Sequence, residues 1–263
     1  MDLVGYLKSN SDFDNHIIID EKATWPKLIY DLIDSSKCEL QNYINERKRI
    51  EIIRNRATRP KNEYEDKWNS VVDLVDSYLQ KHEVIGFQCS RLLDDEIEDI
   101  LVNGLTPLNR DFAIQRINTV CEKGLIPYDL REKLFNKEEL RDENREGAIR
   151  FFHNTSELRI EMGLYEFFKL WGGEAIYSGF EKDPYLQKIG VPCIIMVSIE
   201  YQDLVRYNLS QRMICFFLGE SNYFDHKFES LFAKKIKVLT IVKRNNKLFN
   251  YLTNINHWDE KIN

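Results

Sequence analysis

The pattern of apolar positions changes period three times between residues 145 and 200. A strand-like run at 148–153 is followed by one apolar helical face, and a second strand-like run covers 192–199. The helical face is made of Leu164, Phe167, Phe168 and Trp171. Directly after it, Gly172 and Gly173 end the helix and lead into a predicted short strand at 174–179. Two interpretations of the second glycine stay open: a plain turn, or room for a backbone or ligand to come close.

Helical periodicity dominates the chain before the first strand. Apolar side chains at helical spacing predict helices over about 26–50 and 62–81. A buried strand then begins near Val84 and ends at Cys89-Ser90-Arg91. Acidic residues and a closing Asn103-Gly104 frame the next helix. Further helices are predicted over 110–122 and about 129–139.

The strand-like runs are concentrated in the second half of the chain. They cover 84–91, 148–153, 174–179, 192–199, 212–218, 226–232 and 236–242, about seven strands in one β core. Because helices precede the strands instead of alternating with them, the pattern predicts an α+β fold with antiparallel pairing. We expect a helical N-terminal portion at 1–82 and an α+β domain at 83–263. No G-x-G-x-x-G or P-loop sequence is present.

Composition and charge exclude several classes of protein. The 263 residues are 43% hydrophobic, which is typical of a globular protein. The net charge of −6 gives no overall attraction to DNA or to an anionic membrane. The five cysteines form no C-x-x-C pair and the five histidines no zinc-spaced cluster, so we expect a reducing compartment and no metal. Without a signal-peptide plan or a membrane-length apolar run, the sequence predicts a cytoplasmic protein.

One segment departs from the acidic balance. Between Glu46 and Lys61, seven basic side chains accompany two acidic ones. The candidates for binding nucleic acid in this segment are Arg47, Arg49, Arg54 and Arg56. Arginine's planar fork suits phosphate, but a solvated helix face followed by a basic loop explains the same residues, and we favour that second interpretation.

Four other side chains have competing interpretations. Arg91, at the end of the first predicted strand, either forms a surface ion pair with a following aspartate or acts with Ser90 as a fork for phosphate or carboxylate. His153 is either a hydrogen-bonded structural residue, which we favour, or a base. From the residues alone, Tyr177 fits half-buried packing with its hydroxyl paired. Glu174 either lines a pocket or caps the backbone.

The strand ending in Cys89-Ser90-Arg91, followed by the pattern EI…IL…NGL.PL, resembles the opening strand and helix of ADP-ribosyltransferase-like proteins. The chain also resembles a group of bacterial proteins with a CxRL…EI…NGL start and a WGGEAIY centre, over roughly residues 84–204. The first resemblance implies a split antiparallel β core and NAD as co-substrate. It also implies that Arg91 contacts the NAD phosphates, with Ser90 and Cys89 beside it.

The same resemblance assigns further roles by position. The strands bearing His153 and Glu174 would flank the nicotinamide pocket, and the Tyr177 ring would stack on nicotinamide. Phe228-Glu229-Ser230-Leu231 matches the strand that carries the catalytic glutamate. Glu229 would then stabilise the oxocarbenium-like charge as nicotinamide leaves.

Two departures from the family pattern bear on the acceptor. Lys227 stands where arginine-modifying members carry Glu or Gln, so an anionic acceptor such as RNA or DNA fits better than a protein arginine. The second strand carries no Ser-Thr-Ser. The resemblance implies a toxin or antiphage effector, with an antitoxin protein as a partner. The alternatives are a non-catalytic nucleotide or nucleic-acid binding module and an enzyme that processes RNA phosphates on the same fold.

Overall fold

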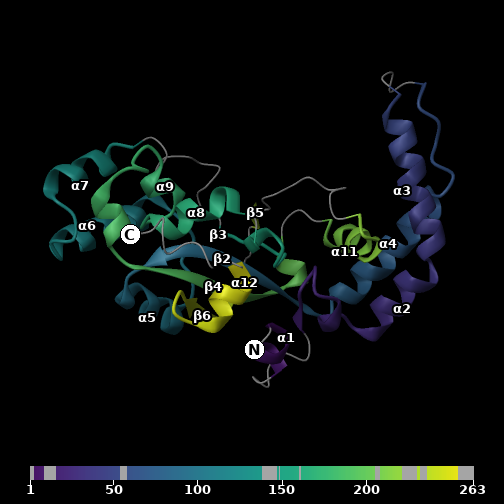
Figure 1. Cartoon of the computed structure of the whole chain (residues 1–263), viewed down its shortest axis with the longest axis horizontal. Coiled ribbons are helices and arrows are strands. Elements are labelled where there is room, and N and C mark those ends of the chain that lie inside the picture. Colours follow the sequence, from purple (N-terminus) through teal and green to yellow (C-terminus); the bar gives the residue numbers. More distant parts are fainter. Residues whose placement is uncertain are drawn as a thin grey trace.

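The computed structural model describes residues 3–8, 16–53, 58–137, 147, 149–159, 161–204, 208–220, 230–231 and 236–253. It combines helices with a four-stranded mixed sheet and a separate two-stranded sheet. Within the described residues, the helices occupy both ends of the molecule and the larger sheet runs between them (Figure 1). The mixture of α and β structure predicted from the sequence is therefore confirmed.

The larger sheet has the order β1-β2-β4-β6. The strands are β1 (His16–Ile17), β2 (Glu83–Leu92), β4 (Val191–Glu200) and β6 (Lys237–Lys243). β2 and β4 pair antiparallel over ten residues, β4 and β6 also pair antiparallel, and β1 pairs parallel with the start of β2. Antiparallel pairing thus dominates, as the sequence predicts, with one parallel pair added.

Within the part of the chain that the structure describes, the smaller sheet joins the larger one through one β-bridge. It pairs β3 (Ile149–Arg150) with β5 (Ser230–Leu231) in antiparallel register. Two residues after β3, Phe152 exchanges two backbone hydrogen bonds of 2.8 Å with Phe87 of β2. Since β4 occupies one edge of β2 throughout, this bridge uses the other edge, beyond the two residues that β1 covers.

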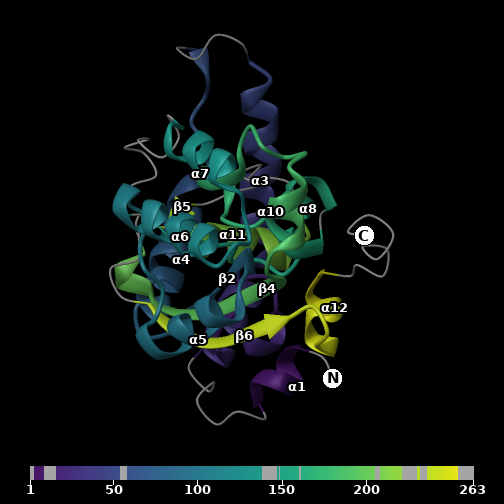
Figure 2. The ribbon, with the colours of Figure 1, turned by 90° about the vertical axis from the view of Figure 1, so that its left-hand side faces the viewer.

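Ten of the described helices are six residues or longer. They are α1 (Leu3–Lys8), α2 (Lys27–Ser35), α3 (Lys37–Glu51), α4 (Glu65–Leu79), α5 (Asp94–Asn103), α6 (Arg110–Glu122), α7 (Tyr128–Phe135), α8 (Glu161–Lys169), α11 (Leu209–Leu218) and α12 (Lys247–Thr253). Short helices follow at α9 (Glu174–Tyr177) and α10 (Pro184–Lys188), with 3₁₀ turns at η1 (Lys22–Thr24), η4 (Glu157–Arg159) and η5 (Tyr201–Asp203). α1 and α12, from opposite ends of the chain, lie side by side (Figure 2).

Strand alternation divides the apolar side chains of β2 between two cores. Val84 and Leu92 pack with α2, α3, α4 and α11, on what we call the α11 face. Ile85, Phe87 and Cys89 pack with α1, α8 and α12, on the α8 face. A third cluster fills the space beneath α6, α7, α9 and α10.

Several predicted elements differ from the structure. The predicted helix at 26–50 is two helices that meet at Ser36, and the helix predicted at 62–81 is confirmed as α4. The strands predicted at 174–179 and 212–218 are wrong, because those residues form α9 and most of α11. Of the strand predicted at 226–232, the described part is β5. The described residues form six strands in two sheets, not seven in one core.

Candidate functional site at Arg91

Arg91 lies inside the protein near the end of β2. It shares the strand alternation of Ile85, Phe87 and Cys89, so its side chain points to the α8 face. The residue is 8% exposed. Its Nε donates to the Ile189 carbonyl oxygen at 2.6 Å, and its Nη1 donates to the Phe168 carbonyl oxygen at 3.1 Å. The strand ends at Leu92, one residue after the predicted end at Arg91.

The surface ion pair considered for Arg91 is absent from the described structure. Asp94 pairs with Lys243, and Asp95 pairs with Lys123. No carboxylate is paired with Arg91 in the described part of the chain, and its Nη2 makes no hydrogen bond there. Burial is the main cause that lowers the pKa of Arg91, and the nearby Arg244 guanidinium lowers it further. A buried arginine beside a second arginine, without an acidic partner, makes this position suited to an anion.

A glycine makes the first of the two Arg91 contacts possible. Gly190 precedes β4 with a φ of +72°, in the left-handed region. A Cβ atom at this position would lie 2.7 Å from the Leu92 carbonyl oxygen. Only glycine therefore lets the turn between α10 and β4 close against the end of β2, which brings the Ile189 carbonyl to the guanidinium.

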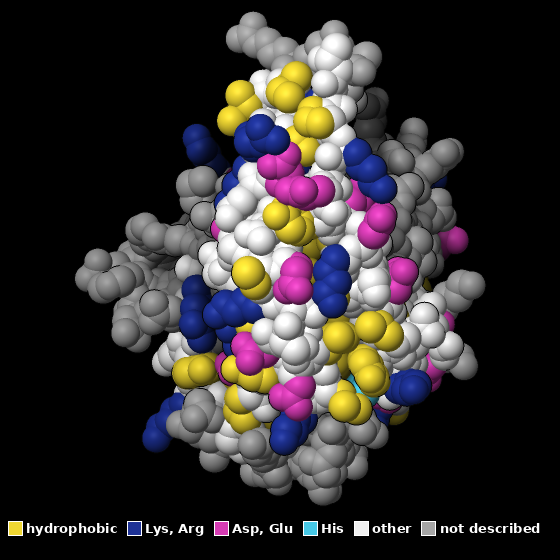
Figure 3. Space-filling model, turned by 90° about the vertical axis from the view of Figure 1, so that its right-hand side faces the viewer, with side chains coloured by type: hydrophobic (Ala, Val, Ile, Leu, Met, Phe, Trp, Pro, Cys, Tyr) yellow, Lys and Arg dark blue, Asp and Glu magenta, His cyan; other side chains and the backbone are white. Residues whose placement is uncertain are grey.

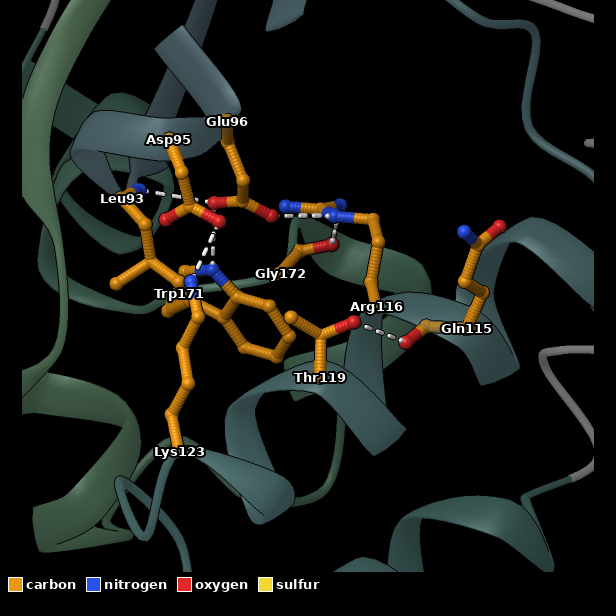
Figure 4. A network of polar contacts seen from close by, with 9 residues as sticks. All are labelled: Leu93, Asp95, Glu96, Gln115, Arg116, Thr119, Lys123, Trp171 and Gly172. Atoms are coloured by element: carbon orange, nitrogen blue, oxygen red, sulfur yellow. Dashed lines mark hydrogen bonds and ion pairs between the residues drawn. The ribbon is translucent and has the colours of Figure 1, made fainter. Parts of the chain in front are cut away.

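The Trp171-Gly172-Gly173 turn is fixed by sterics and by a polar network. A Cβ at Gly172, whose φ is +102°, would lie 2.7 Å from the Ile176 side chain. Gly173 also has a positive φ, 76°, but a Cβ there would meet nothing within 4 Å. Both glycines are thus explained by the turn itself. The Trp171 Nε1 donates to the Glu96 carboxylate at 2.9 Å, so the turn is tied to the start of α5 (Figure 4).

Tyr177 and Glu174 belong to α9. Tyr177 is 4% exposed, and its ring meets the edge of Phe167 with centroids 6.3 Å apart. Because Phe167 and Phe168 are consecutive in α8, the same helical segment contacts both Tyr177 and Arg91. Glu174 is exposed at the first residue of α9. The sequence places a half-buried Tyr177 ring on a strand. In the structure the ring is buried and belongs to a short helix.

His153 lies on the other side of the sheet. Phe151 belongs to the α11-face core and Phe152 packs against the α8-face core, so alternation directs His153 to the α11 face. There the Arg212 guanidinium of α11 is close enough to act on it. Burial, then Arg212, lowers the pKa of His153 to about 3, and the Ile85 backbone offsets part of this. His153 and Arg91 are therefore not brought together.

The segment after His153 is held by a carboxylate from the N-terminal part of the chain. Asp20 accepts hydrogen bonds from the Thr155 amide at 2.8 Å, the Thr155 hydroxyl at 3.1 Å and the Ser156 amide at 2.7 Å. Neither ring nitrogen of His153 has a well-formed hydrogen bond within the described residues. The lowered pKa means that the imidazole is neutral at pH 7.

The two residues before Arg91 also divide between the faces. Cys89 is buried on the α8 face, where desolvation raises the pKa of its thiol, so it is not a thiolate nucleophile. Ser90 is half-buried and alternates to the α11 face. It is therefore directed away from the Arg91 guanidinium.

The described bases of the 46–61 segment are engaged within the chain. Arg47 contacts Glu51 at 2.9 Å, and Arg49 makes two hydrogen bonds to Glu46, of 2.8 and 2.6 Å. Arg59 donates to two backbone carbonyls at the end of α3. Basic and acidic side chains alternate over this end of the molecule (Figure 3). This pairing is what the solvated-face interpretation predicts.

Four predicted site residues lie outside the described residues: Arg54, Arg56, Lys227 and Glu229. The residue that follows Glu229 in the sequence, Ser230, pairs with Arg150 across the small sheet. The sequence interpretation also missed Arg244, Glu96 and Arg116. In the sequence, the acidic residues at the start of α5 indicate only that a helix begins there. The contact between Glu96 and Trp171 joins residues far apart in the chain, so no local pattern predicts it.

Comparisons with protein families, with curated proteins and with solved structures gave no significant match to this chain. Among the described residues, no group of three or more His, Cys, Asp or Glu side chains is arranged to hold a metal ion. The described helices are all too short or too polar to cross a lipid bilayer.

Proposed function

We propose that the protein is an NAD-dependent ADP-ribosyltransferase with an ADP-ribosyltransferase-like split β core. The observation that carries the proposal is the buried Arg91, which has a second arginine nearby and no acidic partner in the described chain. An anionic ligand would relieve the repulsion between the two guanidinium groups and accept a hydrogen bond from Nη2. The diphosphate of NAD is such a ligand, and the resemblance assigns this role to an arginine in the first strand.

The proposed chemistry requires little covalent work from the protein. The glycosidic bond between nicotinamide and ribose is labile in NAD itself, so the chain has to bind, orient and supply an electrostatic field. Arg91 binds phosphate, and Glu229, carried over by motif, stabilises positive charge on the ribose as the bond breaks. Tyr177 supports α8 through Phe167 in the described arrangement, so we assign it to packing beside the site.

Nicotinamide release provides the test of this function. The protein is incubated with NAD and total cellular RNA, and free nicotinamide is measured by chromatography. Glu229→Gln should lower the release rate by about 100-fold or more, the usual effect of removing one group that stabilises a transition state. Arg91→Lys should weaken NAD binding by about 10- to 100-fold, since a charge-assisted hydrogen bond contributes about 1.5–3 kcal/mol.

Arg59→Lys is the matched control for the arginine variant. Arg59 also donates to two backbone carbonyls, those of Ile53 and Glu51, but it lies near the end of α3. Its replacement should leave NAD binding unchanged. Equal weakening by both variants, or release by Glu229→Gln at the unaltered rate, would contradict the assigned roles.

A non-catalytic nucleotide-binding module is the second candidate function. One observation favours it: two of the three Arg91 nitrogens are already used on the carbonyls of Phe168 and Ile189. An arginine engaged in this way can hold a phosphate through Nη2 without contacting the reacting ribose. NAD or ADP-ribose binding by calorimetry, with no nicotinamide released in the presence of RNA, DNA or protein, would select this function instead.

A further inference from the structure

Two separate contacts tie the end of β2 to the end of α8. The first is the hydrogen bond from Arg91 Nη1 to the Phe168 carbonyl oxygen. The second runs through Glu96, whose Oε2 accepts from the Leu93 amide at 2.8 Å and from Trp171 Nε1 at 2.9 Å. Leu93 is two residues after Arg91, and Trp171 is three residues after Phe168. The two contacts therefore form a short closed chain of interactions that includes the guanidinium.

The Glu96 carboxylate is held by a third element as well. Arg116 of α6 donates from Nε to Glu96 Oε1 at 2.7 Å and from Nη1 to the Gly172 carbonyl at 3.3 Å. Its guanidinium carbon lies 5.0 Å from the centre of the Trp171 ring. Figure 4 shows Glu96 between the Leu93 backbone, the Trp171 indole and the Arg116 guanidinium. Both members of this ion pair are largely buried, with side chains 17% and 16% exposed, so its geometry is shielded from competing water.

We propose that Glu96 is a positioning residue for Arg91, acting through Trp171 to fix where α8 presents the Phe168 carbonyl. This fixes the direction in which the remaining nitrogen, Nη2, points. The inference deepens the proposed function, because a preorganised guanidinium binds a phosphate with less loss of side-chain freedom. The positional claim itself does not require that NAD be the ligand.

The experiment reads the Arg91 guanidinium directly. In ¹⁵N-labelled protein, the Nη1–H signals of Arg91, which donates to the Phe168 carbonyl from this nitrogen, are assigned by their loss in Arg91→Lys, and their hydrogen exchange is measured. Trp171→Phe removes the indole N–H and keeps an aromatic ring. We expect it to speed exchange at Arg91 Nη1 by about fivefold or more, the effect of weakening one hydrogen bond. Trp25→Phe, which also removes an indole hydrogen bond, to the Ile18 carbonyl, should leave this signal unchanged.

A second variant guards against a packing defect at the buried Trp171. Glu96→Gln keeps the side-chain shape but replaces one acceptor oxygen by a donor group, and it should also speed the exchange. Its control is Asp95→Asn, which alters a neighbouring carboxylate that pairs with Lys123 at the surface. Unchanged exchange in both folded variants overturns the proposal. Loss of folding in both also overturns it, because the network would then support the whole fold and not Arg91 in particular.

NAD affinity is measured on the same samples. We expect Trp171→Phe and Glu96→Gln to raise the dissociation constant for NAD by about three- to tenfold, with both controls unchanged. If the unaltered protein binds no NAD, the proposed function fails while the exchange result still decides the positional claim. If exchange is unchanged and NAD binds normally, the positional claim fails alone.

Discussion

His153 is a buried histidine whose protonation links the stability of the fold to pH. It is 3% exposed, and burial together with Arg212 lowers its pKa from 6.5 to about 3. At neutral pH the imidazole is uncharged in both the folded and the unfolded chain. Below about pH 6.5 the unfolded chain takes up a proton that the folded protein takes up only near pH 3. The neutral His153 therefore contributes to the free energy of unfolding above pH 6.5, and this contribution is lost as the pH falls from about 6.5 to about 3.

Replacing the histidine should remove this pH dependence. One proton of difference corresponds to about 1.4 kcal/mol of unfolding free energy per pH unit. His153→Gln should make the free energy of unfolding depend less steeply on pH between about 6 and 4, by up to this amount. Urea denaturation at several pH values measures the slope. The control is His82→Gln, at a partly exposed site after α4, which should keep the original slope. Parallel slopes for the two variants would show that His153 titrates normally.

At the scale of elements, the sequence predicts helices and central strands well where the periodic pattern of apolar residues extends over many positions. α4, β2, β4 and β6 lie where the pattern places them, to within one to three residues. The run Arg212–Leu218 fails because it is almost wholly apolar, and a continuous apolar run fits a buried helix and a buried strand equally. α9 fails for another reason: four residues are too few to show a helical period.

The candidate site was less predictable than these elements because its contacts are not local. The sequence selected Arg91 as a candidate, but its two acceptors lie 98 and 77 residues away along the chain. A carbonyl oxygen leaves no mark in the sequence, since every residue has one. Gly190 is a partial signal, because an isolated glycine before a strand often marks a close approach, although it does not say what approaches.

The contact between Asp20 and the Thr155 turn can be tested as a link between elements. Asp20→Ala removes one carboxylate that accepts three hydrogen bonds from residues 135 or more positions away. A charge-assisted hydrogen bond contributes about 1.5–3 kcal/mol, and the contributions of three bonds to one carboxylate do not add fully. We therefore expect the free energy of unfolding to fall by about 2 kcal/mol or more. Amide exchange at Thr155 and Ser156 should accelerate more than elsewhere. Asp183→Ala is the control, because that carboxylate caps its own helix, α10, and should affect only the amides there. Equal acceleration of the Thr155 turn in both variants would contradict the link.

At the scale of the whole molecule, the N-terminal helical portion is part of the main core. α2, α3 and α4 share one apolar cluster with β2, β4 and α11, and β1 is a strand of the larger sheet. Trp68, 1% exposed, is among the largest side chains in that cluster. Unfolding of α4 alone would expose the inward side chains of the central strands to water. Since burial of each large apolar side chain contributes about 1.5–3 kcal/mol, such partial opening is costly.

We therefore expect the two portions, 1–82 and 83–263, to unfold together. Native-state hydrogen exchange in low urea should give opening free energies for buried amides of α4, such as Val75, within about 1 kcal/mol of those in β4, such as Ile195. The five-residue helix α10, at the periphery, should open at lower free energy and report local fluctuation. If the α4 amides instead open together well below those of β4, with a urea dependence of their own, the helical portion is a separate folding unit. Arg91 would then keep its site after those helices detach, because none of its described contacts comes from residues before 83.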